Sequence, residues 1–300
     1  MGIQRRSEKI FNVFNITMLA ILAFATFFPF WYVLVASFNV GSDFARGGVY
    51  FWPRDFTLEN YTRAFRDPRI FASLRISVAR TFIGVIIGLF FTSLVAYAGT
   101  VKTMPGRTAF IFFWYFTTIF GGGMIPFFIL LRTLGLNRSF LLYVLPGIFS
   151  FFNYLLMRVY FDTLPEELRE SAKMDGAGHI RILFQIYWPL SKPILATLAL
   201  FIGVGHWNDW VTAAFFQSRT ELFPAATVLQ RLLREHSPQP VQLGEEGVGQ
   251  ELYLGAFVRT FTPQSLNMAF SMILSMPIVA FYPFLQKYFV KGVMIGAIKG

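Results

Sequence analysis

The sequence predicts an all-α, polytopic membrane protein, and three observations lead to that prediction. Only 14% of the 300 residues are charged, about half the share found in soluble domains. The chain is 55% hydrophobic, and its mean hydropathy is +0.54. Its uncharged runs meet or approach the roughly 20 residues that cross a hydrocarbon core. We therefore expect six transmembrane helices, at residues 14–38, 79–99, 109–131, 140–161, 193–216 and 267–289.

The first uncharged run follows three basic residues and is too long for a cleaved signal peptide, so we expect a retained anchor. Lys and Arg divide evenly between the two sides of the predicted topology, so the whole chain gives no direction. The short segments, taken alone, do indicate an orientation. With the N-terminus inside, both tails and the 100–108 loop carry eight Lys and Arg, whereas the short outer loop has only Arg132 and Arg138. Short segments dominate the positive-inside rule, and both termini are therefore predicted to be cytoplasmic.

Two long outer segments, 39–78 and 217–266, are predicted between the helices. In the first, Thr57 precedes apolar positions at helical spacing, which predicts a short interfacial helix. A group of arginines around the outer entrance of the second helix could guide an anionic sugar or anchor the chain at lipid headgroups. These are Arg63, Arg66, Arg69, Arg75 and Arg80.

The third predicted helix contains three consecutive glycines, Gly121 to Gly123, followed by Pro126. Such a sequence breaks or kinks a helix. Irregular backbone at that depth is tolerated where protein or a water-filled cavity satisfies its polar groups. A packing kink and a cavity-lining role both remain open.

Several kinds of chemistry are missing from the sequence. It has no cysteine, no phosphate-binding P-loop and no His-Glu-x-x-His metal motif, and its three histidines lie far apart. The net charge of +10 is accounted for by Lys and Arg that flank membrane helices, so nucleic acid is not an expected partner. No catalytic residue and no metal site are predicted, and we do not expect an enzyme.

Residues 165–189 form a polar stretch within this hydrophobic chain. Pro165 and the acidic residues after it favour a helix start, Gly176 permits a turn, and a second short helix is expected over 179–187, before Pro189. An ordered, charged segment on a membrane face is typical of a docking element. The alternative is an ordinary amphipathic linker.

The same stretch resembles the EAA motif of ABC-importer permease subunits, in Glu170-Ser-Ala, Asp175-Gly-Ala and Ile186-Tyr-Trp-Pro. Serine in place of the usual second alanine is a mild departure. Four other stretches resemble the carbohydrate branch of that family, the MalG-like and LplC-like permeases. These are residues 120–126, 155–161, 205–210 and 288–300, so the resemblance covers nearly the whole chain.

The resemblance implies a type I permease fold in the bacterial inner membrane. Residues 1–300 would be a single transmembrane domain with a cytoplasmic coupling segment at 162–190. The implied partners are a second homologous permease, two ATP-binding subunits and an extracytoplasmic solute-binding protein. This chain would bind no cofactor, because ATP and Mg belong to the partner ATPase.

The resemblance also implies which residues couple this chain to the ATPase. Glu170 would be a polar anchor, Gly176 a hinge, and Ala172 and Ala177 contact points. The full implied set is Glu170, Ser171, Ala172, Asp175, Gly176, Ala177 and Pro189.

A candidate substrate path lies in the fourth and fifth predicted helices. Aromatic faces beside hydrogen-bonding groups suit a sugar, although Trp is also frequent at membrane interfaces and Asn often bonds a neighbouring helix. The candidates are Asn153, Trp207, Asn208, Asp209 and Trp210. The LplC-like stretches, together with the outer arginines, favour alginate or another acidic polysaccharide as the imported substrate.

Two other functions compete with the importer. An ion-coupled secondary transporter of sugars needs buried carboxylates, and the predicted membrane helices offer only Asp209. A membrane enzyme acting on lipid-linked sugars needs convergent acids or a metal near one membrane face, and the only acid-rich loop at a face is the coupling segment itself.

Overall fold

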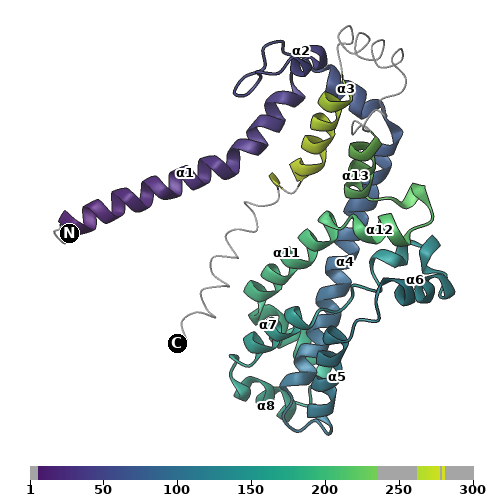
Figure 1. Ribbon diagram of the computed structural model, residues 1–300. Helices are drawn as coiled ribbons and strands as arrows, with labels where there is room; N and C mark the ends of the chain where they lie inside the picture. Colours follow the sequence, from purple (N-terminus) through teal and green to yellow (C-terminus); the bar gives the residue numbers. More distant parts are fainter. Residues whose placement is uncertain (1–5, 236–261, 278, 281–300) are drawn as a thin grey trace. The chain divides into compact units, whose positions relative to one another are not determined.

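The computed structural model describes residues 6–235, 262–277, 279 and 280 (Figure 1). This part of the chain is built from helices and has no strand, only an isolated bridge between Asn39 and Phe56. It groups into two compact units. Among the described residues, unit 1 comprises 6–68, 231–235 and 262–275, and unit 2 comprises 69–230, 276, 277, 279 and 280. That the whole chain forms a single permease domain stays a prediction.

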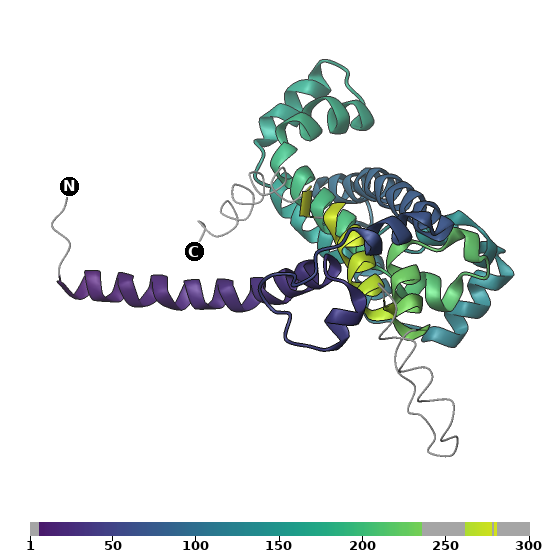
Figure 2. The ribbon, with the colours of Figure 1, turned by 90° about the horizontal axis from the view of Figure 1, so that it is seen from above.

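Unit 1 contains three named helices and the helical residues 263–275. The helices are α1 (Arg6–Ser37), α2 (Gly41–Ala45) and α3 (Glu59–Arg66). Helix α1 runs without interruption in both views (Figures 1 and 2). The interfacial helix predicted after Thr57 is α3, and the Thr57 hydroxyl accepts a hydrogen bond from the Glu59 N–H at 3.1 Å.

Asn60, which is fully buried, joins the three parts of unit 1. Its side-chain amide donates to the carbonyls of Ser37 and Asn39, each at 3.0 Å. Its carbonyl oxygen accepts from the Ser265 hydroxyl, also at 3.0 Å. A buried amide is stabilising only when its donors and acceptor are satisfied, and here all three elements supply partners.

Unit 2 is built around α4 (Pro68–Thr100), a helix of 33 residues. The remaining α-helices here are α5 (Arg107–Ile119), α6 (Met124–Thr133), α7 (Phe151–Phe161), α8 (Glu166–Met174), α9 (His179–Ile182), α10 (Trp188–Leu190), α11 (Lys192–Asn208), α12 (Val211–Phe216) and α13 (Ala225–Glu235), which runs past the end of the unit. Shorter helical turns are η1 (Leu136–Arg138), η2 (Phe140–Tyr143), the π-helical η3 (Leu183–Tyr187) and η4 (Thr220–Leu222).

Length and composition mark two helices of the described residues as membrane spans, Glu8–Ser37 and Pro68–Thr100. Two bent pairs pass the same test when each pair is taken together, which gives up to four spans. The six predicted spans are therefore not directly confirmed. The third one is broken as predicted, because α5 and α6 meet at 110° on either side of the three glycines.

The other predicted spans differ from the structure at their ends. The prediction of one continuous helix over 140–161 is wrong. Only η2 and α7 are helical in this range, and Pro146-Gly147 lies between them. The predicted 193–216 helix is divided after Asn208 into α11 and α12. Of the predicted 267–289 helix, residues 267–277, 279 and 280 are described and helical. The others lie outside the described residues.

Helices α4 and α11 pack closely along what we call the glycine seam, formed by Gly84, Gly88 and Gly203. A Cβ added at Gly84 would lie 2.2 Å from the His206 ring, and one at Gly88 would lie 3.3 Å from Ile202. From the other side, a Cβ at Gly203 would meet the Val85 side chain at 3.4 Å. Small residues four apart let membrane helices approach closely.

The seam predicts a steric effect at Gly84. In Gly84→Ala the new methyl group forces the His206 ring to move, and overpacking of this kind costs about 1–3 kcal/mol. The thermal unfolding midpoint of the detergent-purified protein should fall accordingly. Gly205→Ala is the matched control, because nothing lies within 4 Å of a Cβ there. An equal fall in both variants would contradict the seam.

Candidate functional site

The predicted coupling segment folds as two helical pieces joined by a glycine turn, as the sequence indicated. Helix α8 ends in hydrogen bonds from the Gly176 N–H to the Lys173 carbonyl at 3.0 Å and from the Ala177 N–H to the Ala172 carbonyl at 2.9 Å. This is a Schellman cap, which requires a left-handed residue after the helix end. Gly176 supplies it with a φ of 79°.

The second piece is longer than predicted. It continues from His179 to Leu190 and bends by 89° at Ser191 before α11 begins. Pro189 was expected to end the helix but lies within it, and that expectation is wrong. A π-helical turn, Leu183–Tyr187, precedes the proline. A locally widened turn of this kind accommodates the proline's missing N–H and its ring.

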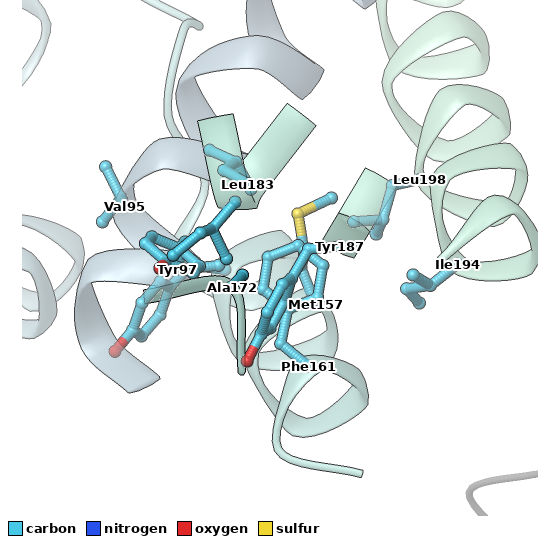
Figure 3. Close-up of a cluster of buried hydrophobic side chains, with 12 residues drawn as sticks. Val95, Tyr97, Met157, Phe161, Ala172, Leu183, Tyr187, Ile194 and Leu198 are labelled. Carbon is cyan, nitrogen blue, oxygen red and sulfur yellow. The ribbon is translucent and has the colours of Figure 1, made fainter. Parts of the chain in front are cut away.

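The coupling segment is anchored in the hydrophobic core of unit 2 (Figure 3). It contributes buried side chains that meet α4, α7 and α11. The labelled members are Val95, Tyr97, Met157, Phe161, Ala172, Leu183, Tyr187, Ile194 and Leu198. Two edge-to-face contacts tie the cluster together, Tyr187 with Tyr97 at 5.1 Å and with Phe161 at 5.2 Å between ring centroids. Such contacts add to the burial of the rings themselves.

Polar contacts fasten the segment to the C-terminal end of α4. The Tyr97 hydroxyl lies 3.1 Å from Nδ1 of His179. Glu166, in the first turn of α8, pairs with Lys102 at 2.7 Å and also with Arg169. The hydrogen bond from Lys102 is the largest cause that lowers the pKa of Glu166, and the charges of both cations add to it. The segment is therefore attached to the end of α4 and to the residues that follow it.

The residues implied for coupling divide between surface and core. Exposed members are Glu170, Ser171, Asp175, Gly176 and Pro189. Ala172 is buried in the core cluster, and Ala177 is half-buried, so the small size of Ala172 serves packing within this chain.

Sequence reasoning missed two apolar residues that flank the Gly176 turn. Met174 is 89% exposed and Ile180 is 61% exposed. Large apolar side chains in an otherwise polar segment were the signal that could have identified them, because an exposed apolar patch often marks an interaction site.

The turn geometry predicts different effects for neighbouring glycines. Gly176→Ala places a Cβ on a left-handed residue, which costs about 1–2 kcal/mol. Gly178→Ala should be nearly neutral, since Gly178 has a φ of −72° and open space around it. Thermal unfolding of both variants measures the difference. Equal midpoints would show that the left-handed turn is not required.

The lowered pKa of Glu166 predicts a pH-dependent effect of Lys102. Because the carboxylate is favoured in the folded state, its stabilising contribution is present above the ordinary pKa of 4.5 and disappears as the pH falls through the lowered value. Lys102→Met should therefore lower the unfolding midpoint at pH 7, and this difference should close in acid below pH 4.5. For Lys192→Met, a lysine outside this pair, the difference should not change over that range. A pH-independent effect of Lys102→Met would contradict the assignment.

The candidate substrate path lies at the break between α11 and α12. Helix α11 ends at Asn208, and Asp209 follows in an extended conformation. Asn208 is exposed, whereas Trp207, Asp209 and Trp210 are half-buried. Asn153 is half-buried on α7, the helix that contacts α11 through Phe152 and Phe201, whose centroids are 6.4 Å apart.

Asp209 is held by Arg80, a partner that the sequence did not identify. The Arg80 guanidinium donates to the Asp209 carboxylate at 2.6 Å and to its backbone carbonyl at 2.9 Å. Arg80 is 1% exposed, so its assignment to the outer group of arginines is wrong. The other four members, Arg63, Arg66, Arg69 and Arg75, are exposed.

No known protein-family model matches the chain, but individual relatives match it over nearly its full length. The chain is 33% identical to protein LplC of Bacillus subtilis (strain 168) over 297 residues, covering 98% of this chain and 97% of the relative. The polygalacturonan/rhamnogalacturonan transport system permease protein YtcP of the same strain is 32% identical over 98% of this chain and 99% of its own.

A solved structure agrees with these relatives. It is the crystal structure of a bacterial ABC transporter involved in the import of the acidic polysaccharide alginate. The match has a TM-score of 0.83 at 30% identity and covers 96% of this chain and 100% of that chain. The chain belongs to the carbohydrate ABC-importer permease family.

Membership of this family settles several expectations from the sequence. The protein is a non-enzymatic permease subunit of an ABC importer for sugars or polysaccharides, with the family's helical membrane fold. ABC-importer permeases work with a second permease, an ATPase and a solute-binding protein. Permeases of this family are bacterial inner membrane proteins. The comparisons give no support to an ion-coupled secondary transporter.

Proposed function

We propose that this chain forms half of the translocation path of an ATP-driven importer for an acidic oligo- or polysaccharide. It would assemble with a second, homologous permease, two ATP-binding subunits and an extracytoplasmic solute-binding protein. Both of its termini, and the coupling segment, would face the cytoplasm. Its candidate path residues are Asn153, Trp207, Asn208, Asp209 and Trp210.

The coupling role rests on one observation, the form of the segment around Gly176. Its inner face is part of the core of unit 2, while Glu170, Met174 and Ile180 are exposed on its outside. A segment anchored in this way can transmit a displacement of a docked ATPase to α4, α7 and α11 as a rigid-body movement. In this proposal Met174 and Ile180 replace Ala172 as the apolar contacts.

The substrate class is supported by what the matched proteins carry. Two of the matches reported above name a polysaccharide with uronic acid units, polygalacturonan/rhamnogalacturonan and alginate. Exposed arginines on the outer segments of this chain fit a substrate of the same charge, because a positive surface raises the local concentration of an anion.

Isolation of the tagged chain from its native membrane in mild detergent tests the assembly. We expect an ATPase and a second permease in the purified material, identified by mass spectrometry. Uptake of oligouronates into vesicles should stop when ATP is depleted. Recovery of this chain alone, while a control importer survives the same detergent, would contradict the proposal. So would uptake that depends on an ion gradient instead.

Met174 gives a sharper test of the coupling surface. Because the side chain is 89% exposed, Met174→Ala should leave the stability of the chain unchanged. If the side chain is buried against the ATPase, losing its contact area weakens assembly by about 1–2 kcal/mol, which is roughly a tenfold change in affinity. Leu134→Ala is the matched control, since Leu134 is 62% exposed outside the coupling segment.

The affinity of the ATPase for the permease pair can be measured by titration in nanodiscs. Glu170→Ala and Gly176→Ala should, in addition, reduce transport per ATP hydrolysed. Equal affinities for Met174→Ala and Leu134→Ala would remove Met174 from the docking surface.

A further inference from the structure

Arg80 lies on α4, but its guanidinium acts at the break between α11 and α12. It donates two hydrogen bonds to Asp209, one to the carboxylate and one to the backbone carbonyl. Its cationic carbon lies 4.5 Å from the ring centroid of Tyr143. A buried charge is tolerated when it is paired and hydrogen-bonded, and Asp209 and Tyr143 provide those partners.

Asp209 is held through both carboxylate oxygens and through its backbone carbonyl. One carboxylate oxygen accepts from Arg80, and the other accepts from the Thr212 N–H at 3.0 Å, in the first turn of α12. Its backbone carbonyl, left free by the end of α11, accepts from Arg80 as well. Asp209 therefore fixes the direction in which the chain leaves α11.

The same region of α4 is pressed against α11. Gly84 lies one turn from Arg80 and receives the ring of His206, and Gly88 lies a further turn along the seam. Contacts at Arg80, Gly84 and Gly88 thus follow one face of α4, since residues four apart share a helix face. The pair cannot slide or separate here without breaking both the seam and the ion pair.

At their other ends, α4 and α11 both meet the coupling segment. Tyr97 and Lys102 bind His179 and Glu166, while α11 follows the segment after a single residue, Ser191. From Arg80 to Tyr97, α4 spans about 25 Å at 1.5 Å per residue. Helices α4 and α11 are thus joined at one end by Arg80 and Asp209 and at the other end by the coupling segment. We call this arrangement the closed frame, and it transmits a displacement better than a single helix does.

We propose that Arg80 is a positioning residue for transport, because it closes this frame at the end distant from the ATPase. Through Asp209 it fixes residues 205–210, which carry the candidate path residues Trp207 to Trp210, to α4. A displacement of the coupling segment then reaches the path as one rigid-body motion. This inference rests on the proposed function of the coupling segment and names a further residue on which that function depends.

The test uses the complete importer reconstituted in proteoliposomes with its binding protein. Removing Asp209 alone leaves a buried unpaired cation and risks misfolding, so the main variant is the neutral double change Arg80→Met with Asp209→Asn. The matched control is Arg219→Met with Glu221→Gln, which removes an exposed pair of the same unit. Arg80→Lys keeps the charge but not the two-pronged contact.

We expect the double variant to assemble and to retain ATP hydrolysis stimulated by the loaded binding protein within about twofold, while uronate transported per ATP falls at least fivefold. Arg80→Lys should lie between the double variant and the unmodified protein, and the Arg219/Glu221 control should match the unmodified protein. A purely structural role would lower assembly and hydrolysis together and would leave the ratio unchanged.

A distance measurement checks the rigid-body step itself. The chain has no cysteine, so spin labels can be placed at Thr103→Cys and Thr220→Cys, two exposed positions of unit 2. In the otherwise unmodified importer the distance between the labels should be the same with and without bound ATP. In the Arg80/Asp209 double variant it should shift or broaden when ATP binds.

The outcomes separate this proposal from the function on which it rests. If the unmodified importer takes up uronate with ATP, but the double variant keeps both its transport ratio and a constant label distance, only the role of Arg80 is overturned. If the unmodified importer shows no ATP-dependent uptake of any oligosaccharide offered, the proposed function fails and this inference fails with it.

Discussion

The close contact between α4 and α11 is the interaction on which the rest of unit 2 depends. Within a membrane, lipid is as apolar as leucine, so helices associate through close packing and buried polar contacts instead of hydrophobic exclusion. The seam provides the packing, with Gly84 and Gly88 facing α11 and Gly203 facing α4. The Arg80–Asp209 pair provides the polar contact at one end. Both the core cluster and the coupling segment are built onto this pair of helices.

The predicted coupling segment shows how packing can make a polar element stiff. A short helix is marginal on its own, because most helical stability in proteins comes from tertiary packing. Here α8 buries Ala172, and the second piece buries Leu183 and Tyr187 beside α4 and α7. The turn between them is closed by backbone hydrogen bonds at Gly176. A force applied to the exposed surface of this segment would therefore act on a packed body and not on a hinged loop.

Local signals in the sequence predicted the local features of this structure. The glycine turn at Gly176, the helix after Thr57 and the break at Gly121 to Gly123 each depend on residues next to one another, and the structure has all three. Helix ends that depend on packing against neighbouring elements were harder to predict from the sequence. Proline alone suggested a stop at Pro189, but the π-helical turn before it lets the helix continue.

The Arg80–Asp209 pair could not be predicted in the same way. The two residues are 129 positions apart, so no local pattern in the sequence pairs them. Its place on the buried face of α4 is visible only once α11 is packed there. Ala172 is a similar case: its small size indicated close packing correctly, but the surface it packs against belongs to this chain.

The pairing also bears on the kind of substrate that this region can accept. An unpaired carboxylate beside the path would repel a polymer of uronic acids, because like charges at close range in a low-dielectric site are strongly unfavourable. Arg80 balances the charge of Asp209, and the Thr212 N–H occupies its second oxygen. The other candidate path residues at this break are Trp207, Asn208 and Trp210, two aromatic side chains and an amide without net charge. The one acid in the fifth predicted span is thus compatible with an acidic polysaccharide, which the sequence alone left unexplained.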